Sequence, residues 1–380
     1  MMLFHAARCT KNIREAFTLK SMNNTKGLST LLLTTIIGAS LAGCSSTNTP
    51  AANASNPTST ANTTAQTEAP QPTEKALSGN LVVYSAGPEG LANKIKDGFE
   101  AKTGVKVEMF QGTTGKILAR MEAEKSNPVV DVVVLASLPS MQGMKNDGLL
   151  LPYKEAVNAD KLVSDWSDTA DGNYFSYSAS ALGIVYNTKK VSTPPTSWDD
   201  LTKAEWKGTV NIPDPSLSGS ALDFVTGYLS AKGDSGWDLF KQYKSNGVAM
   251  AGANQEALDP VITGAKSVVA SGVDYMAYKA KADGEPVDIV YPAEGTVISP
   301  RPAAIIKTSP NVDNAKAFID YLLSDEAQAL VAKAYLLPGR TDVKAENRAN
   351  LDEIKTFDVK WEWMNEHSDE VSSTFTQILK

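Results

Sequence analysis

Short apolar segments alternate with amphipathic ones between residues 81 and 135, and this alternation restricts the fold more than any other feature of the chain. Three buried strands are expected, at residues 81–84, 105–110 and 129–135. Two helices are expected between them, at residues 90–102 and 115–125. In the first of these, Leu91, Ile95 and Phe99 recur every four residues and mark one apolar face. Strands alternating with helices of this length predict right-handed crossovers and a parallel sheet in an α/β fold.

The remaining sequence keeps both kinds of element but no longer alternates regularly. Extended segments are expected at residues 178–187, 208–214 and 287–291. Helices are expected at residues 198–206, 221–232, 236–246, 314–323 and 325–334. No internal repeat is evident.

The segment at residues 29–46 has the features of a secretory signal. Lys26 precedes a short apolar run, and the run ends in small residues followed by Cys44. The run is shorter than the roughly 20 apolar residues that a membrane span needs. The sequence Leu-Ala-Gly-Cys resembles the bacterial lipobox, whose cysteine is acylated after cleavage. We therefore expect a signal peptide over 1–43, with Met22 as an alternative start.

Residues 44–77 are expected to form a lipidated cysteine and a disordered linker. They are rich in Ala, Ser, Thr, Asn and Pro and contain almost no large apolar residue. Such a stretch buries too little surface to offset its chain entropy. The expected product is a lipoprotein held at a membrane in the periplasm or at the cell surface.

The scarcity of cysteine and histidine excludes several kinds of chemistry. Cys9 and Cys44 are the only cysteines, so the mature domain has no internal disulfide and no thiol nucleophile. The only histidines are His5, in the expected presequence, and His367, near the C-terminus, so no motif supports a Ser-His-Asp triad or a histidine-based zinc site. Removing 1–43 takes away five basic side chains and one acidic one, which changes the formal net charge from −7 to −11. A charge of this sign disfavours nucleic acid as a partner.

Five segments carry a resemblance to a known family. They are NLVVYSAG (80–87), the stretch from GVKVEMFQGTTG to VVDVVV (104–134), ALGIVYNTKKV (181–191), the stretch from SWDDL to LSGSA (197–221), and the stretch from NVDNAKAF to EAQALV (311–331). In this order they resemble periplasmic solute-binding proteins of ABC importers. The group contains binders of ferric iron, thiamine, phosphonates and sugar phosphates.

The resemblance implies an α/β, two-lobed periplasmic binding protein type II fold with the ligand in the interlobe cleft and two hinge strands. The expected parts are lobe 1 (78–180 plus 292–345), lobe 2 (186–288), two crossings at 178–187 and 287–291, and a C-terminal tail (346–380) that packs on lobe 1. The resemblance also implies a monomer that delivers its ligand to an ABC permease in the inner membrane, without a cofactor and without enzymatic activity.

In parallel sheets, ligands bind at the carboxyl ends of the strands. Ser85 follows the first strand of lobe 1 and Ser137 follows the third. Thr113 and Thr114 open the helix after the second strand, where free N–H groups and the helix dipole favour an anion.

In lobe 2, two serines open a helix in the same way, and further polar residues follow the later strands. The candidates in this part of the chain are Ser218, Ser220, Asp274, Tyr278, Glu294 and Thr296. Two helix openings on different lobes would together form an anion cradle.

These residues favour a phosphorylated or phosphonate anion, and three alternatives stay open. Ferric members of the family show two adjacent tyrosines near position 274, which this chain lacks. A ferric ion would then use Tyr275, Tyr278, Asp274 and Glu294, since hard cations prefer oxygen ligands. A thiamine-like cation would stack on aromatic side chains. The alternative of another class is a surface hydrolase, for which no nucleophile–base pair is evident.

Overall fold

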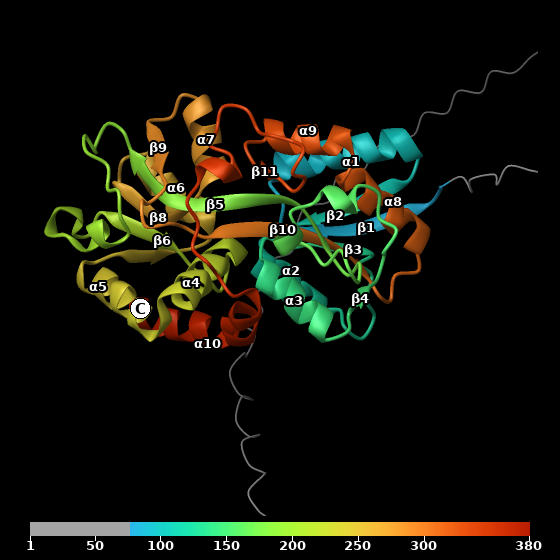
Figure 1. The fold of residues 1–380 in the computed structure, drawn as a ribbon, viewed down its shortest axis with the longest axis horizontal. Helices are drawn as coiled ribbons and strands as arrows, with labels where there is room; N and C mark the ends of the chain where they lie inside the picture. Colours follow the sequence, from blue (N-terminus) through green and yellow to red (C-terminus); the bar gives the residue numbers. More distant parts are fainter. Residues whose placement is uncertain (1–76) are drawn as a thin grey trace, which may run out of the picture. The chain divides into compact units, whose positions relative to one another are not determined.

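The computed structural model describes residues 77–380, whose strands join in an eleven-stranded sheet (Figure 1). The central order is β2-β1-β3-β10-β5-β8-β6-β7, with β4 beside β10 and with β9 and β11 beside β5. The strands are β1 (Asn80–Ser85), β2 (Lys106–Gln111), β3 (Val132–Val134), β4 (Leu150–Leu151), β5 (Phe175–Asn187), β6 (Val210–Pro213), β7 (Ala249–Ala251), β8 (Val268–Val273), β9 (Val287–Val290), β10 (Ile298–Ile306) and β11 (Leu337–Pro338). The predicted signal peptide, Cys44 and all of the linker except Leu77 lie outside the described residues.

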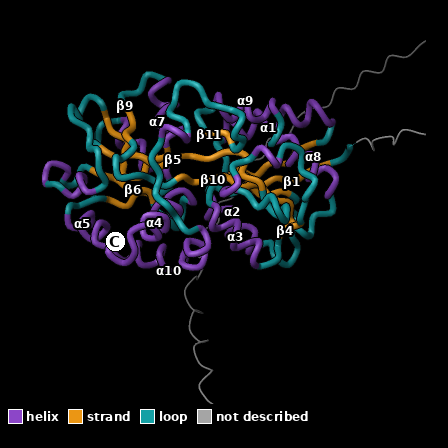
Figure 2. Tube along the Cα trace, in the orientation of Figure 1, coloured by secondary structure: helices purple, strands orange, loops and turns teal. Residues whose placement is uncertain are grey.

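Helices cover both faces of the sheet (Figure 2). They are α1 (Glu89–Thr103), α2 (Thr114–Ala123), α3 (Leu138–Asn146), α4 (Gly219–Lys232), α5 (Trp237–Ser245), α6 (Asn254–Ile262), α7 (Asp274–Ala282), α8 (Val312–Leu322), α9 (Asp325–Lys333) and α10 (Trp361–Leu379). Short 3-10 helices lie at Ala159–Lys161, Ser164–Trp166, Asp199–Thr202, Ala204–Trp206, Gly233–Gly236 and Leu351–Glu353.

The first lobe, built on β1, β2, β3, β4 and β10, has the predicted parallel sheet at its start. Strand β1 pairs in parallel with β2 on one side and with β3 on the other. Leu91, Ile95 and Phe99 of α1 are buried together, as their spacing predicts. Helices α1, α8 and α9 pack on one face of this half-sheet and α2 and α3 on the other. This arrangement puts the carboxyl ends of β1 and β2 directly before the first turns of α1 and α2.

Strand β5 is the long crossing strand that the sequence predicts. Its first part, from Phe175, pairs with β10, and its last part, up to Asn187, pairs with β8 and β9. The return crossing lies slightly later than expected. Strand β9 pairs only with the end of β5, and the chain crosses back over residues 291–297, where Leu182 N–H donates to the carbonyl of Val297 at 3.1 Å.

The second lobe, built on β6, β7, β8 and β9, repeats the layered arrangement. Strand β6 pairs in parallel with β7 and β8. Helices α4 and α5 pack on one face, and α6 and α7 on the other. The predicted helix over 198–206 is instead two 3-10 helices, and Trp198, which precedes the first, and Trp206, which ends the second, are buried in the core.

Helix α10 crosses from one lobe to the other, which corrects the expectation that the tail packs on lobe 1. Its first part contacts α3, and its last part contacts α4 and α5 (Figure 1). Val371, Phe375 and Leu379 belong to the apolar core of the second lobe, and the Phe375 ring lies 5.1 Å from that of Phe240. The apolar positions of α10 extend over its whole length, so one helix covers core surface on both lobes.

Candidate functional site

A cavity of about 390 Å³ lies where the helix N-termini of the two lobes face each other. Its walls come from the first turns of α1 and α2 in the first lobe and of α4, α6 and α7 in the second. The lining comprises residues 86–89, 111–114, 116, 136, 218–220, 253–256, 275, 276 and 301. Four predicted ligand residues are among them, namely Thr113, Thr114, Ser218 and Ser220, together with Tyr275 from the ferric alternative.

The first lobe contributes the N-terminus of α2. Thr113 caps this helix, and its side chain accepts a hydrogen bond from the N–H of Lys116 at 3.4 Å. Thr114 Oγ1 accepts a hydrogen bond from the N–H of Ala136 at 3.0 Å, which ties α2 to the end of β3. The first N–H groups of a helix have no partner within it, and the helix dipole adds positive charge there. This wall therefore favours an anion.

The second lobe contributes the N-terminus of α4 in the same way. Ser218 caps the helix by accepting a hydrogen bond from the N–H of Ala221 at 3.2 Å. Its hydroxyl donates to Asn254 Oδ1 at 3.1 Å, and Asn254 Nδ2 donates to Ser220 Oγ at 2.9 Å. The amide of Asn254 thus fixes both serine hydroxyls at the cavity wall. Two positive helix ends, one from each lobe, meet at one cavity.

Arg301 is the lining residue that the sequence analysis missed. It lies on β10 with 3% of its surface exposed, and its Nη1 is 3.4 Å from Ser178 Oγ. Its Nε has no hydrogen-bond partner, and no carboxylate of residues 77–380 lies within 4.0 Å of its guanidinium nitrogens. The guanidinium carbon is 5.8 Å from the centroid of the Tyr275 ring. The sequence signal was an arginine between two prolines in a strand that is mostly apolar.

The charges of the cavity are therefore distributed unevenly between its interior and its mouth. Arg301 is buried, whereas Glu89, Lys116 and Glu256 lie on exposed first turns. Burial raises the pKa of Tyr275, and the charge of Arg301 only partly offsets this. The cavity lining thus combines a tyrosine that stays neutral with a guanidinium that has no carboxylate of residues 77–380 within 4.0 Å, and the nearby buried carboxyl of Asp223 interacts with that guanidinium only at longer range.

Ser85 and Ser137 lie near this cavity without lining it. Ser85 is 3% exposed and accepts a hydrogen bond from the N–H of Gly87 at 3.1 Å. Ser137 caps α3, and its hydroxyl donates to Asp223 Oδ1 at 2.6 Å. Both serines therefore have partners within the protein, Ser85 in its own turn and Ser137 on the other lobe.

Asp223 joins the two lobes behind the cavity. It lies on α4, is fully buried, and accepts hydrogen bonds from Ser137 of the first lobe and from Ser299 of β10, the latter at 2.8 Å. Burial raises the pKa of Asp223 to about 7, although both hydroxyls and the charge of Arg301 oppose the rise. The carboxyl group is therefore partly protonated near neutral pH.

Asp274 has a structural environment away from the cavity. Its Oδ2 accepts hydrogen bonds from Arg348 Nη2 at 2.6 Å and from the N–H of Ala181 at 2.9 Å, and both members of the ion pair are fully buried. Tyr278 stacks on Tyr335 at 6.4 Å and does not line the cavity. Asp274 Oδ1 accepts a hydrogen bond from the N–H of Tyr275 at 2.7 Å, so both carboxylate oxygens have partners within the protein.

Glu294 and Thr296 also lie outside the cavity. Glu294 Oε1 accepts hydrogen bonds from the N–H of Trp198 at 2.7 Å and from Ser197 Oγ at 3.0 Å, and so supports the start of a 3-10 helix. Thr296 is buried, and its hydroxyl donates to the carbonyl of Leu182 in the crossing strand. The six predicted residues outside the cavity therefore hold the lobes and crossings in place.

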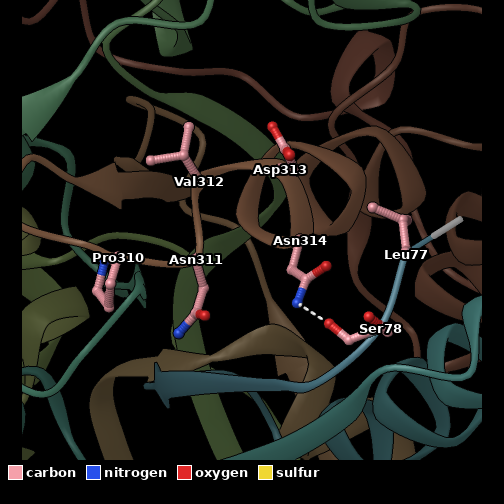
Figure 3. A pocket seen from close by; sticks show the side chains of 7 residues that line it. All are labelled: Leu77, Ser78, Pro310, Asn311, Val312, Asp313 and Asn314. Atoms are coloured by element: carbon pink, nitrogen blue, oxygen red, sulfur yellow. Dashed lines mark hydrogen bonds between the residues drawn. The ribbon is translucent and has the colours of Figure 1, made fainter. Parts of the chain in front are cut away.

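A second cavity of about 420 Å³ lies at the beginning of the described chain, between the start of β1 and the start of α8 (Figure 3). Leu77, Ser78 and residues 310–314 line it, and Asn314 Nδ2 donates to the carbonyl of Ser78 at 2.9 Å. None of the predicted ligand residues lies there, and Asp313, the charged residue among its described lining residues, is exposed. We therefore take the interlobe cavity as the candidate site.

Known proteins share this architecture. A periplasmic binding protein of Actinobacillus pleuropneumoniae, AfuA, solved with fructose 6-phosphate bound, superposes with a TM-score of 0.73 at 26% identity over 79% of this chain and 98% of that one. A putative 2-aminoethylphosphonate-binding periplasmic protein of Salmonella typhimurium is 26% identical over 70% of this chain and 81% of its own length. Iron uptake protein A1 of Synechocystis is 27% identical over 66% and 73%.

The two-lobed type II fold expected from the sequence is confirmed by these structural relatives. Over residues 77–380, no helix is long and apolar enough to cross a membrane. The family model for bacterial extracellular solute-binding proteins matches residues 127–367, which is more than half of the chain. This protein therefore belongs to the family of bacterial extracellular solute-binding proteins.

Proposed function

We propose that the protein serves an ABC importer by capturing a small phosphorylated or phosphonate anion between its lobes. The observation that carries this proposal is Arg301, a buried guanidinium that lines the cavity without a carboxylate within ion-pairing distance among residues 77–380. Burying an unpaired charge is unfavourable, and a bound anion would supply the missing partner.

The geometry around Arg301 supports an anion with several oxygens. The N-termini of α2 and α4 approach from opposite lobes, and each adds N–H donors and hydroxyl groups. A tetrahedral phosphate or phosphonate has enough acceptor oxygens for the guanidinium and for both helices. The cavity volume of about 390 Å³ leaves room for an organic substituent beside the anionic group. Two relatives add support, since one is named as a putative 2-aminoethylphosphonate-binding protein and the other was solved with fructose 6-phosphate bound.

Ferric iron is the second candidate, because a relative is named as an iron uptake protein. Tyr275 is the only tyrosine that lines the cavity, and the carboxylates there are the exposed Glu89 and Glu256. A trivalent cation placed beside Arg301 would also be repelled by it unless an anion lay between them. A thiamine-like cation meets the same repulsion and finds one aromatic ring. The donor set therefore favours the anion.

Replacement of Arg301 tests this function directly. Purified wild type and Arg301→Gln would be titrated calorimetrically with fructose 6-phosphate, 2-aminoethylphosphonate, inorganic phosphate and ferric citrate. A hydrogen bond to a charged group contributes about 1.5–3 kcal/mol, so affinity for a phosphorylated compound should fall by roughly ten- to 150-fold.

Arg120→Gln is the matched control. Arg120 lies on the same lobe, outside the cavity, and pairs with Glu124 at 2.8 Å. Its loss should leave affinity unchanged. Equal affinity in Arg301→Gln and wild type would reject the anion assignment, and binding of ferric citrate alone with a tyrosinate–iron colour would favour the ferric alternative.

The delivery part of the proposal includes a location and partners. A protein with this role would be held outside the cytoplasm, in the periplasm or at the cell surface, by lipid on Cys44. The closed, loaded form of the monomer would dock on the permease, since a ligand that contacts both lobes stabilises closure. Binding and release without covalent chemistry account for this role, so no enzymatic step is proposed.

A further inference from the structure

The two lobes touch where the first turn of α2 meets the loop before α4. Gly115 is the second residue of α2, and an added Cβ there would lie 2.7 Å from the carbonyl oxygen of Ser216 and 3.5 Å from Leu217 Cα. Both neighbours are backbone atoms of the other lobe, so no flexible side chain could turn aside. The lobes approach this closely only because residue 115 has no side chain.

The loop that faces Gly115 is held firmly in place. Asp214 Oδ1 accepts hydrogen bonds from the N–H and the hydroxyl of Ser216, at 2.8 and 2.6 Å. The carbonyl of Asp214 accepts from the N–H groups of Leu217 and Ser218, at 3.1 and 2.9 Å. The N–H of Asp214 donates to the carbonyl groups of residues 251 and 252. A clash at position 115 would therefore move the whole lobe rather than the loop alone.

A second glycine, on the second lobe, lies similarly close to backbone atoms of the first lobe. An added Cβ at Gly219, the first residue of α4, would lie 2.4 Å from the carbonyl oxygen of Ala136 and 2.6 Å from Thr114 Oγ1. Gly115 and Gly219 thus each mark a close approach to the other lobe, and we call these two approaches together the glycine contact. This contact sets how closely the two helix N-termini approach.

We propose that Gly115 is a positioning residue for ligand capture, because its missing side chain lets the lobes close far enough for the N-termini of α2 and α4 to hold one ligand together. The inference rests on the proposed function for the ligand class, but the contact itself is independent of that class. Gly219 also allows the lobes to close, but it lines the cavity, so a substitution there could change ligand contacts directly. Gly115 does not line the cavity, so a substitution there tests closure alone.

Alanine at position 115 separates closure from folding stability. Gly115 has no positive φ, and alanine is more favourable than glycine within a helix. Gly115→Ala should therefore leave the unfolding temperature of the ligand-free protein unchanged or raise it. The same substitution should hinder closure and so reduce the fraction of molecules competent to bind tightly. A substitution that affects only folding would not lower ligand affinity while leaving the unfolding temperature unchanged or higher.

Gly90→Ala is the matched control. Gly90 is the second residue of α1, has no positive φ, and would place its Cβ in open space with nothing within 4 Å. Thermal unfolding and calorimetric titration with fructose 6-phosphate and 2-aminoethylphosphonate would be compared for both variants. We expect at least about a tenfold loss of affinity in Gly115→Ala and none in Gly90→Ala. Equal affinity of Gly115→Ala and wild type would overturn the inference.

A distance measurement tests closure without relying on the identity of the ligand. Spin labels at Lys94→Cys in α1 and Lys207→Cys in the second lobe, with Cys9 and Cys44 replaced by serine, report the separation of the lobes. Both labelled positions are exposed. The distances of ligand-free wild type should include a population as short as this contact requires, and Gly115→Ala should lose that population. Persistence of the short distances in Gly115→Ala, or their absence from wild type, would refute the inference. If wild type binds neither probe, the proposed function fails while this comparison still decides the role of Gly115.

Discussion

Asp223 makes the stability of this protein depend on pH in a way that a single substitution isolates. Its carboxyl group is fully buried between the lobes, and burial raises its pKa to about 7. In an unfolded chain the same group titrates near 3.9. Because the folded state holds the proton more tightly, this group stabilises the folded state below about pH 4 and loses that contribution as the pH rises to about 7.

The magnitude follows from the difference between the two pKa values. A difference of about three pH units corresponds to about 4 kcal/mol over the whole range, and about 2.5 kcal/mol of it is lost between about pH 5 and about pH 8. Asp223→Asn keeps the shape and the contacts with Ser137 and Ser299 but does not titrate. Wild type should therefore lose about 2.5 kcal/mol relative to Asp223→Asn over this interval.

Urea unfolding of both proteins at several pH values measures this difference. Other titrating groups are common to the two chains and cancel in the comparison. If the unfolding free energies of wild type and Asp223→Asn run parallel between about pH 5 and about pH 8, Asp223 is not held protonated by burial and the reasoning is refuted.

Three further predictions concern Arg348 and Glu294, whose contacts the structure shows, and Cys44, which lies outside the described residues. Arg348→Met should destabilise the protein by about 3–5 kcal/mol in urea unfolding, because it leaves Asp274 buried without its partner, and a loss below about 1 kcal/mol would contradict the structural role of the pair. Glu294→Gln should lower stability by about 1 kcal/mol through the weakened hydrogen bond from Trp198 and leave ligand affinity unchanged, whereas a tenfold affinity loss would return Glu294 to the binding site. Cys44→Ala should release the protein from membranes in cell fractionation, and retention in the membrane fraction would exclude lipidation there.

The apolar patterns of the sequence predicted several strands and helices and the helix openings that line the cavity. The apolar runs at residues 81–84 and 129–135 correctly predicted strands, the second of which is formed over Val132–Val134 only. The spacing of Leu91, Ile95 and Phe99 correctly predicted a helix. The helix openings at Thr113 and Ser218 reach one cavity because both follow the carboxyl ends of parallel strands.

Long-range pairings account for what the sequence did not reveal. Asp274 follows a strand, like a ligand residue, but its partner Arg348 lies 74 residues away and no local pattern links them. Glu294 likewise holds Trp198 across 96 residues. Arg301 gives no periodic signal, because its importance comes from burial without a counter-charge, which only the packed structure reveals.

The most direct test of the central claim is a thermal-shift screen of the protein against fructose 6-phosphate, 2-aminoethylphosphonate, inorganic phosphate, thiamine and ferric citrate. A ligand present at about 100 times its dissociation constant stabilises the folded state by about 2.7 kcal/mol, which raises the unfolding temperature by a few degrees. We expect phosphorylated or phosphonate compounds to produce this rise in wild type and Arg301→Gln to abolish it. A rise with ferric citrate or thiamine alone would contradict the assignment of an anion to the cavity between the lobes.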